Sequence, residues 1–160
     1  GKAAFDAAKE VALHQLDVRA RSQHELESAM TSRGFSSETA REVIERLAEL
    51  GLVDDLAFAR AFARGRFEAG GKTGSALKMD LSRKGLSSQI IAQVLSEIDA
   101  DEEYSRAHAL AEKKMRSLTL HDRQVIRRRL FSMLARKGYA PQVCIRVIDE
   151  LLESEDCDEL

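Results

Sequence analysis

One stretch decides the fold of this chain: Ser82-Arg83-Lys84-Gly85-Leu86-Ser87-Ser88. Two related stretches repeat its pattern, Thr31-Ser32-Arg33-Gly34-Phe35-Ser36-Ser37 and Ala135-Arg136-Lys137-Gly138-Tyr139-Ala140-Pro141. In each, a basic residue precedes a glycine, and a large apolar residue and a small residue follow it. Glycine reaches the left-handed conformation that ends helices, and a basic residue in the last turn complements the helix dipole. Each stretch therefore predicts the end of one helix and the start of the next.

The residues after each glycine carry signals for a helix start. Ser36 and Ser87 are predicted N-caps, and Pro141, the only proline in the chain, falls at a first helical position. The apolar residue after the glycine is expected to pack on the residue five positions further along, as a hydrophobic staple. The three predicted pairs are Phe35–Ala40, Leu86–Ile91 and Tyr139–Cys144.

Apolar residues repeat in step with the glycines. Eight and four positions before them lie Leu26 and Met30, Leu77 and Leu81, and Leu130 and Leu134. Residues four apart share one face of a helix. The glycines are 51 and 53 residues apart, which leaves room for a third helix in every unit.

The sequence therefore predicts an all-α protein of three tandem three-helix bundles, similar to helix-turn-helix units and forming an elongated, curved body. The expected repeats are residues 1–53, 54–98 and 99–152, followed by an acidic C-terminal tail at 153–160.

Composition narrows the class of protein. The chain is 44% hydrophobic, has two cysteines and lacks any apolar run long enough to span a bilayer. No secretory signal pattern opens it. Cys144 is predicted to be a core residue and Cys157 lies in the acidic tail, so we expect no disulfide and a cytoplasmic location.

Charge is unevenly distributed along the chain. Residues 101–148 carry 11 basic and 5 acidic side chains, whereas residues 149–160 carry 7 acidic and no basic ones. A basic third repeat favours polyanion binding, which the acidic tail would screen or compete with. The alternative is that the tail is simply solvated.

Seven basic residues are the candidates for contact with a partner or with DNA. A block of arginines on a helix is otherwise a solvated face. The candidates are Arg60, Arg64, Arg66, Lys113, Lys114, Arg128 and Arg129. A second set is predicted to act in caps and packing instead: Gly34, Asp54, Asp55, Phe58, Gly85 and Gly138.

Catalysis finds little support in the sequence. The four histidines are scattered without metal-ligand spacing, and no nucleophile turn is present. The glycine-rich residues 69–74 superficially resemble a phosphate-binding loop, but Arg66 stands where that loop needs its first glycine. We interpret the segment as a flexible helix junction with Thr73 as a candidate cap. The sequence predicts no enzyme, no cofactor and no metal.

Several motifs in order along the chain resemble the RecX family, regulators of the bacterial RecA recombinase. The central signature is Val53-Asp54-Asp55-Leu56-Ala57-Phe58-Ala59-Arg60, followed by Arg66, Gly74 and Arg83-Lys84-Gly85-Leu86. Arg127-Arg128-Arg129-Leu130 extends the resemblance toward the C-terminus. The resemblance implies tandem three-helix repeats that lodge in the groove of RecA filaments on single-stranded DNA. It also implies inhibition of ATP hydrolysis, strand exchange and co-protease activity, and thus a role in DNA repair and the SOS response.

Two other classes of function stay open at this point. One is a helix-turn-helix-like protein that binds DNA directly, without a filament partner. The other is a structural adaptor for another protein. The expected partners are the RecA filament and single-stranded and double-stranded DNA, with no membrane contact, and the chain is expected to be a monomer.

Overall fold

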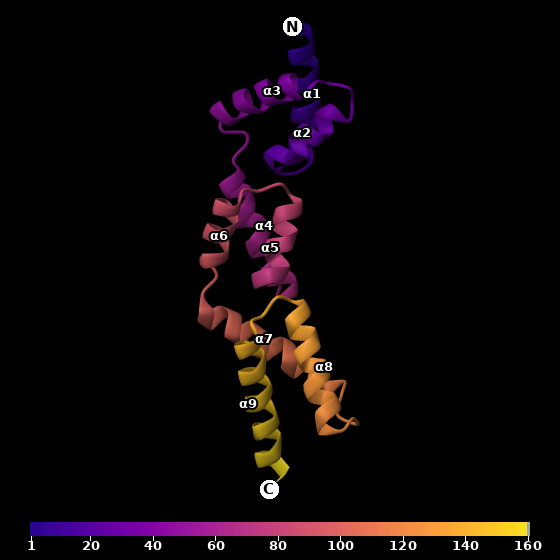
Figure 1. Ribbon diagram of the computed structural model, residues 1–160, viewed down its shortest axis with the longest axis vertical. Helices are drawn as coiled ribbons and strands as arrows, with labels where there is room; N and C mark the ends of the chain where they lie inside the picture. The colour runs from indigo at the N-terminus through magenta and orange to yellow at the C-terminus, as the bar shows by residue number, and fades with distance from the viewer. Residues whose placement is uncertain (160) are drawn as a thin grey trace. The chain divides into compact units, whose positions relative to one another are not determined.

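The computed structural model describes the backbone of residues 1–159 and the side chains of residues 1–154. Every regular element in that part of the chain is an α-helix (Figure 1). The helices are α1 (Lys2–Val18), α2 (Gln23–Thr31), α3 (Ser37–Glu49), α4 (Asp55–Gly70), α5 (Gly74–Arg83), α6 (Ser88–Ser96), α7 (Ala100–Arg116), α8 (Arg123–Arg136) and α9 (Pro141–Glu159). The predicted all-α fold with three helices per repeat is confirmed.

The helix starts predicted at Ser36, Ser87 and Pro141 are also confirmed, and Ser22 provides a further cap. Ser22 forms a capping box with Glu25, and Ser36 accepts a hydrogen bond from the Thr39 amide. Ser87 caps α6, through a 3.2 Å bond from the Ile90 amide, and α9 begins at Pro141. Each cap satisfies an amide that has no acceptor within its own helix. Local sequence therefore sets the boundaries of these helices.

The first and third repeats each enclose a core. In the first, α1, α2 and α3 bury side chains that include Leu26, Met30 and Leu47. In the third, α7, α8 and α9 bury Leu130, Leu134 and Cys144 among others. Cys144 is fully buried and unpaired, which confirms its predicted role as a core residue. The side chain of Cys157 lies outside the described residues.

By contacts, the chain divides into two compact units. Unit 1 comprises residues 1–62 and 80–94, and unit 2 comprises residues 63–79 and 95–160. The first repeat lies wholly in unit 1 and the third wholly in unit 2, while α4, α5 and α6 each contribute residues to both. Each unit therefore contains one terminal repeat and part of the second repeat.

Within unit 1, the turn after α5 packs on the N-terminus of α2. The buried Ser22 hydroxyl donates a 2.7 Å hydrogen bond to the Lys84 carbonyl. Gly85 lies so close that an added Cβ would collide with the Cβ of His24. The amide of Gln23 donates a 2.9 Å bond to the Asp55 carboxylate. Asp55, predicted to act in caps and packing, therefore also accepts a hydrogen bond from the first repeat.

Within unit 2, the turn after α8 packs in the same way on the N-terminus of α5. The Thr73 amide donates a 2.9 Å hydrogen bond to the Lys137 carbonyl. A Cβ on Gly138 would collide with the Thr73 backbone carbonyl. Tyr139 is nearly fully buried beside this contact, and burial raises the pKa of its phenol to about 12.

These two contacts join equivalent positions of the repeats, although the donor is a side-chain hydroxyl in unit 1 and a backbone amide in unit 2, and we call each a repeat joint. Ser22 and Thr73 both lie 12 positions before the glycine of their own repeat, and Lys84 and Lys137 both directly precede a glycine. In the third repeat the position of Ser22 and Thr73 is occupied by Ile126, which is buried within α8. The described residues therefore contain two repeat joints.

The repeat joint corrects one expectation from the sequence. We interpreted residues 69–74 as a flexible junction, but Gly71 and Thr73 are buried, and Thr73 is only 1% exposed. A Cβ at Gly71 would press on Leu110 and Tyr139. The glycines in this segment therefore permit close packing as well as a turn.

An ion-pair network strengthens the joint of unit 1. Glu25 accepts bonds from Arg19 at 2.7 Å and from the Lys84 ammonium at 3.0 Å. Partial burial alone would raise the pKa of Glu25, but the bonds from Arg19 and Lys84 more than offset this and hold the pKa at about 2. Lys84 also lies 5.6 Å from the centre of the Phe62 ring, a cation–π contact.

We predict that alanine substitutions at the three turn glycines differ in cost. All three have a positive φ, so each substitution loses about 1 kcal/mol or more from backbone strain. Gly34 has nothing within 4 Å of an added Cβ, whereas Gly85 and Gly138 would also force a repeat joint apart. We expect Gly85→Ala and Gly138→Ala to lose about 3 kcal/mol or more. Urea unfolding followed by circular dichroism measures this, and equal losses at all three positions would contradict the joint.

We predict a pH-dependent contribution from Glu25. Its pKa is lower in the folded than in the unfolded chain, so its stabilisation is present above about pH 4.5 and is lost as the pH falls toward 2. Glu25→Gln should therefore reduce the free energy of unfolding by about 1 kcal/mol at pH 7 and have little effect near pH 2. Urea unfolding across this pH range tests it. A loss that is the same at both ends would show that the carboxylate charge is not responsible.

Candidate functional site

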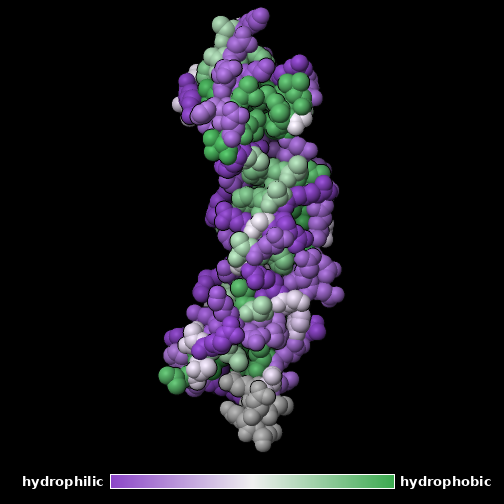
Figure 2. All heavy atoms as spheres, turned by 180° about the vertical axis from the view of Figure 1, so that it is seen from behind, coloured by the Kyte–Doolittle hydropathy of each residue, from purple (hydrophilic) through white to green (hydrophobic). Residues whose placement is uncertain are grey.

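Uncompensated positive charge gathers on the third repeat. Figure 2 shows that hydrophilic side chains cover most of one face of the molecule and that apolar side chains appear there in patches. Among the candidate residues on α7 and α8, Lys113, Lys114, Arg128 and Arg129 are all exposed. Arg128 and Arg129 therefore lie outside the core of the third repeat.

Three lysines form one cluster in unit 2. Lys113 and Lys114 come from the last turn of α7 and Lys137 from the C-terminal cap of α8. Together with Leu110, Ser117 and Met133 they line an open pocket of about 360 Å³. None of the three ammonium groups forms an ion pair with a described side chain. We call Lys113, Lys114 and Lys137 the lysine cluster. Such a cluster can bind phosphate groups without reading base sequence.

Lys137 is not among the seven candidates predicted from the sequence, although a comparison between repeats reveals it. Lys84 occupies the equivalent position, directly before its glycine, and its charge is neutralised by Glu25. The residue equivalent to Glu25 in the second repeat is Ala76, so Lys137 meets no carboxylate there. Like Lys84, Lys137 takes part in a repeat joint, but its ammonium remains available to a ligand.

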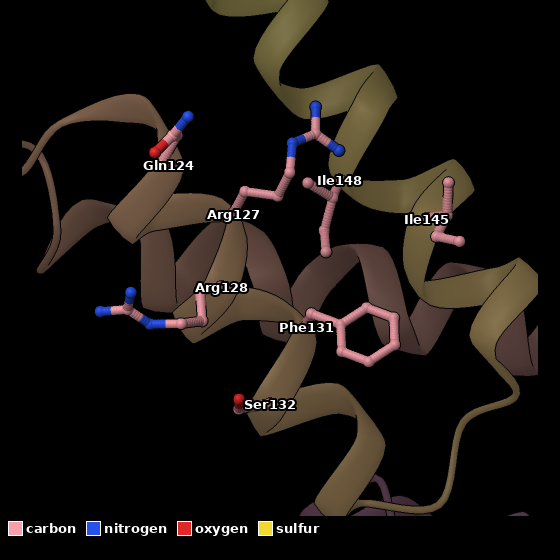
Figure 3. Close-up of a pocket in the computed structure, with 7 residues that line it drawn as sticks. All are labelled: Gln124, Arg127, Arg128, Phe131, Ser132, Ile145 and Ile148. Atoms are coloured by element: carbon pink, nitrogen blue, oxygen red, sulfur yellow. The ribbon is translucent and has the colours of Figure 1, made fainter.

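A second surface lies between α8 and α9, on another side of α8. It is a groove of about 410 Å³ lined by Gln124, Arg127, Arg128, Phe131, Ser132, Ile145 and Ile148 (Figure 3). We call it the α8–α9 groove. Arg127 lies at its edge and pairs with Asp149 on α9 at 2.7 Å. Arg128 points away from the apolar residues in Figure 3 and pairs with none of the described carboxylates. None of the apolar residues of this groove is among the candidates predicted from the sequence.

Arg129 and the arginines of α4 are placed differently. Arg129 approaches the ring of His121 at 3.5 Å and lines neither surface. Arg64 pairs with Glu102 at 2.8 Å and with Glu68 at 3.9 Å, so its charge is largely compensated within unit 2. Arg60 and Arg66 are exposed and also interact with other residues of the protein. Of the seven candidates, Lys113 and Lys114 line one pocket and Arg128 lines the α8–α9 groove. The remaining four line neither surface: Arg60, Arg64, Arg66 and Arg129.

No group of three or more histidine, cysteine, aspartate or glutamate side chains in the described part of the chain is arranged to hold a metal ion. His108 pairs with Glu112 at 3.5 Å on the surface of α7. None of the described helices is long and apolar enough to cross a membrane.

The sequence matches the three domains of one family, in order. Residues 8–47 match the first three-helix domain of RecX, residues 54–95 the second and residues 101–148 the third. The three matches together cover most of the chain.

Relatives with the same name span nearly the whole chain. The Regulatory protein RecX of Amycolatopsis mediterranei is 38% identical over 92% of this chain and 85% of its own length. That of Mycolicibacterium smegmatis is 36% identical over 94% of this chain and 82% of its own.

The fold is also that of a solved structure. The crystal structure of RecX from Lactobacillus salivarius superposes with a TM-score of 0.87 at 22% identity, covering 94% of this chain and 98% of that one. Three matching domains, relatives above 30% identity and a shared fold agree: the chain belongs to the RecX family of regulatory proteins.

Proposed function

We propose that this protein is a negative modulator of RecA that binds RecA filaments on single-stranded DNA. In this proposal it reduces ATP hydrolysis, strand exchange and co-protease activity, and so restrains recombination and the SOS response. It acts in the cytoplasm as a monomer, without catalysis or a cofactor. The proposed repeats are residues 1–53, 54–98 and 99–152, followed by the acidic segment 153–160.

One observation carries the proposal beyond family membership: the unpaired charge of the lysine cluster. A lysine already engaged by a carboxylate must give up that pair before it can bind a phosphate, as Lys84 would have to give up Glu25. Lys113, Lys114 and Lys137 have no such pair to break among the described side chains. Their spacing around one pocket suits a flexible phosphate backbone.

The proposed contact surface refines the seven candidates. Lys113 and Lys114, with Lys137, contact the DNA backbone, and Arg128 and Arg129 add positive charge on the same repeat. Arg64 contributes less, because Glu102 and Glu68 already compensate it. Arg60 and Arg66 stay in the proposal as secondary contacts.

Direct sequence-specific DNA binding is the weaker alternative. A helix-turn-helix protein reads bases with polar and basic residues of its last helix. Here α9 has Arg146 as its single basic residue and carries Asp149, Glu150 and Glu153, which would repel the DNA backbone.

We predict that replacing the lysine cluster weakens inhibition. Wild-type protein should reduce the single-stranded-DNA-dependent ATPase rate of RecA filaments in a dose-dependent way. The variant Lys113→Gln with Lys114→Gln and Lys137→Gln should require about tenfold more protein for the same inhibition. The slope of log affinity for a single-stranded oligonucleotide against log salt should fall by about 2, since each lost phosphate contact removes about 0.7.

Two control variants show whether the loss of inhibition depends on the lysine cluster itself or on the lower positive charge of the protein. Lys84→Gln changes the equivalent lysine of the second repeat, and should lower stability but leave the salt slope unchanged. Lys2→Gln with Lys9→Gln removes charge from α1, and should change neither inhibition nor slope. If wild-type protein leaves the ATPase unchanged while it binds naked DNA, direct DNA binding replaces the proposed function.

A further inference from the structure

Large apolar side chains occupy both wall positions of the α8–α9 groove only in the third repeat. Phe131 lies seven positions before Gly138, where the other repeats have Glu27 and Lys78. Ile145 lies seven positions after Gly138, where they have Arg41 and Ala92. The core positions behind the groove do not change in this way: Ile148 corresponds to Ile44 and Leu95.

The fold itself does not require these apolar side chains. Ile145 is 49% exposed and Phe131 is partly buried, so both present apolar surface to water. The first repeat forms a closed core with charged residues at the same two positions. Exposed apolar side chains gathered in a groove are typical of a site for another protein.

The rim of the groove adds charge of one sign. Arg127 is neutralised by Asp149, which leaves Arg128 as the groove's arginine without a described acidic partner. Gln124 and Ser132 add hydrogen-bonding groups beside it (Figure 3). An occupant that fits this arrangement has an apolar side chain that packs on the apolar lining of the groove and a carboxylate that pairs with Arg128.

The apolar lining of the groove does not suit a phosphate backbone. Phe131, Ile145 and Ile148 offer no hydrogen-bond donor, in contrast to the three ammonium groups of the lysine cluster. The two surfaces therefore have different chemistry, although both lie in unit 2.

We propose that the α8–α9 groove binds a protein partner that presents an exposed apolar side chain next to a carboxylate. The inference rests on the proposed function for the identity of that partner, RecA. In this division the lysine cluster contacts DNA, and the groove contacts the RecA protomer.

The test gives the groove the side chains that the first repeat carries at the same positions. The variant Phe131→Glu with Ile145→Arg introduces one charge of each sign, so it leaves the net charge and the long-range attraction to DNA unchanged. The matched control, Glu27→Arg with Arg41→Glu, is also neutral and alters the equivalent positions of the first repeat. Ile145→Arg alone serves if the double variant loses its helical circular dichroism.

Binding is measured to RecA filaments on single-stranded DNA and, separately, to the naked oligonucleotide. We expect the groove variant to bind filaments at least tenfold more weakly and the oligonucleotide within twofold of wild type, with the control unchanged in both. Unchanged filament binding by the groove variant would overturn the inference and leave the proposed function standing. So would a selective loss of oligonucleotide binding, which would indicate a base stacked on Phe131. Wild-type protein that fails to bind filaments would overturn both.

Discussion

The structure depends on a contact between a helix N-terminus and the turn of the following repeat. The first amides of a helix have no acceptor within it, and a buried helix end needs partners from elsewhere. Here the partner is the backbone carbonyl of a lysine, which accepts from the side-chain hydroxyl of Ser22 in unit 1 and from the backbone amide of Thr73 in unit 2. The glycine after each lysine lets the two backbones approach. Glycine at this position thus both ends a helix and allows two repeats to pack together.

The third repeat ends this series of joints. Its α8 begins earlier relative to its glycine than α2 and α5 do, so Ile126 is buried where Ser22 and Thr73 stand. The N-terminal part of α8, which lines the α8–α9 groove, is therefore relieved of joining a further repeat. Lys137 of the lysine cluster, in contrast, still takes part in the joint of unit 2.

Local sequence predicted much of the fold. The turn glycines, the caps at Ser36 and Ser87 and the apolar positions of each second helix follow from short-range rules that hold whatever the tertiary structure. The repeat joint did not follow, because it links residues about 60 positions apart, and glycine-rich residues 69–74 read locally as flexible. The signal was present in the equal spacing of Ser22 and Thr73 from their glycines.

The candidate site was less predictable for a related reason. A basic residue in the sequence does not reveal its partner: Arg64 is paired with Glu102, whereas Lys137 has no described partner. The groove was missed because Phe131 fits the apolar pattern of an amphipathic helix, and its exposure depends on where α9 lies. Aligning the repeats on their glycines exposes both cases, since Ala76 replaces Glu25 and Phe131 replaces Glu27.

The most direct test of the repeat joint is amide hydrogen exchange at Thr73. An amide at a helix N-terminus normally exchanges fast, because it lacks an acceptor in its own helix. The 2.9 Å bond to the Lys137 carbonyl, in a buried setting, predicts protection near that of the Leu134 amide in the core of the third repeat. Exchange as fast as at Glu38, an exposed residue in the first turn of α3, would contradict the joint as the constraint on which this fold depends.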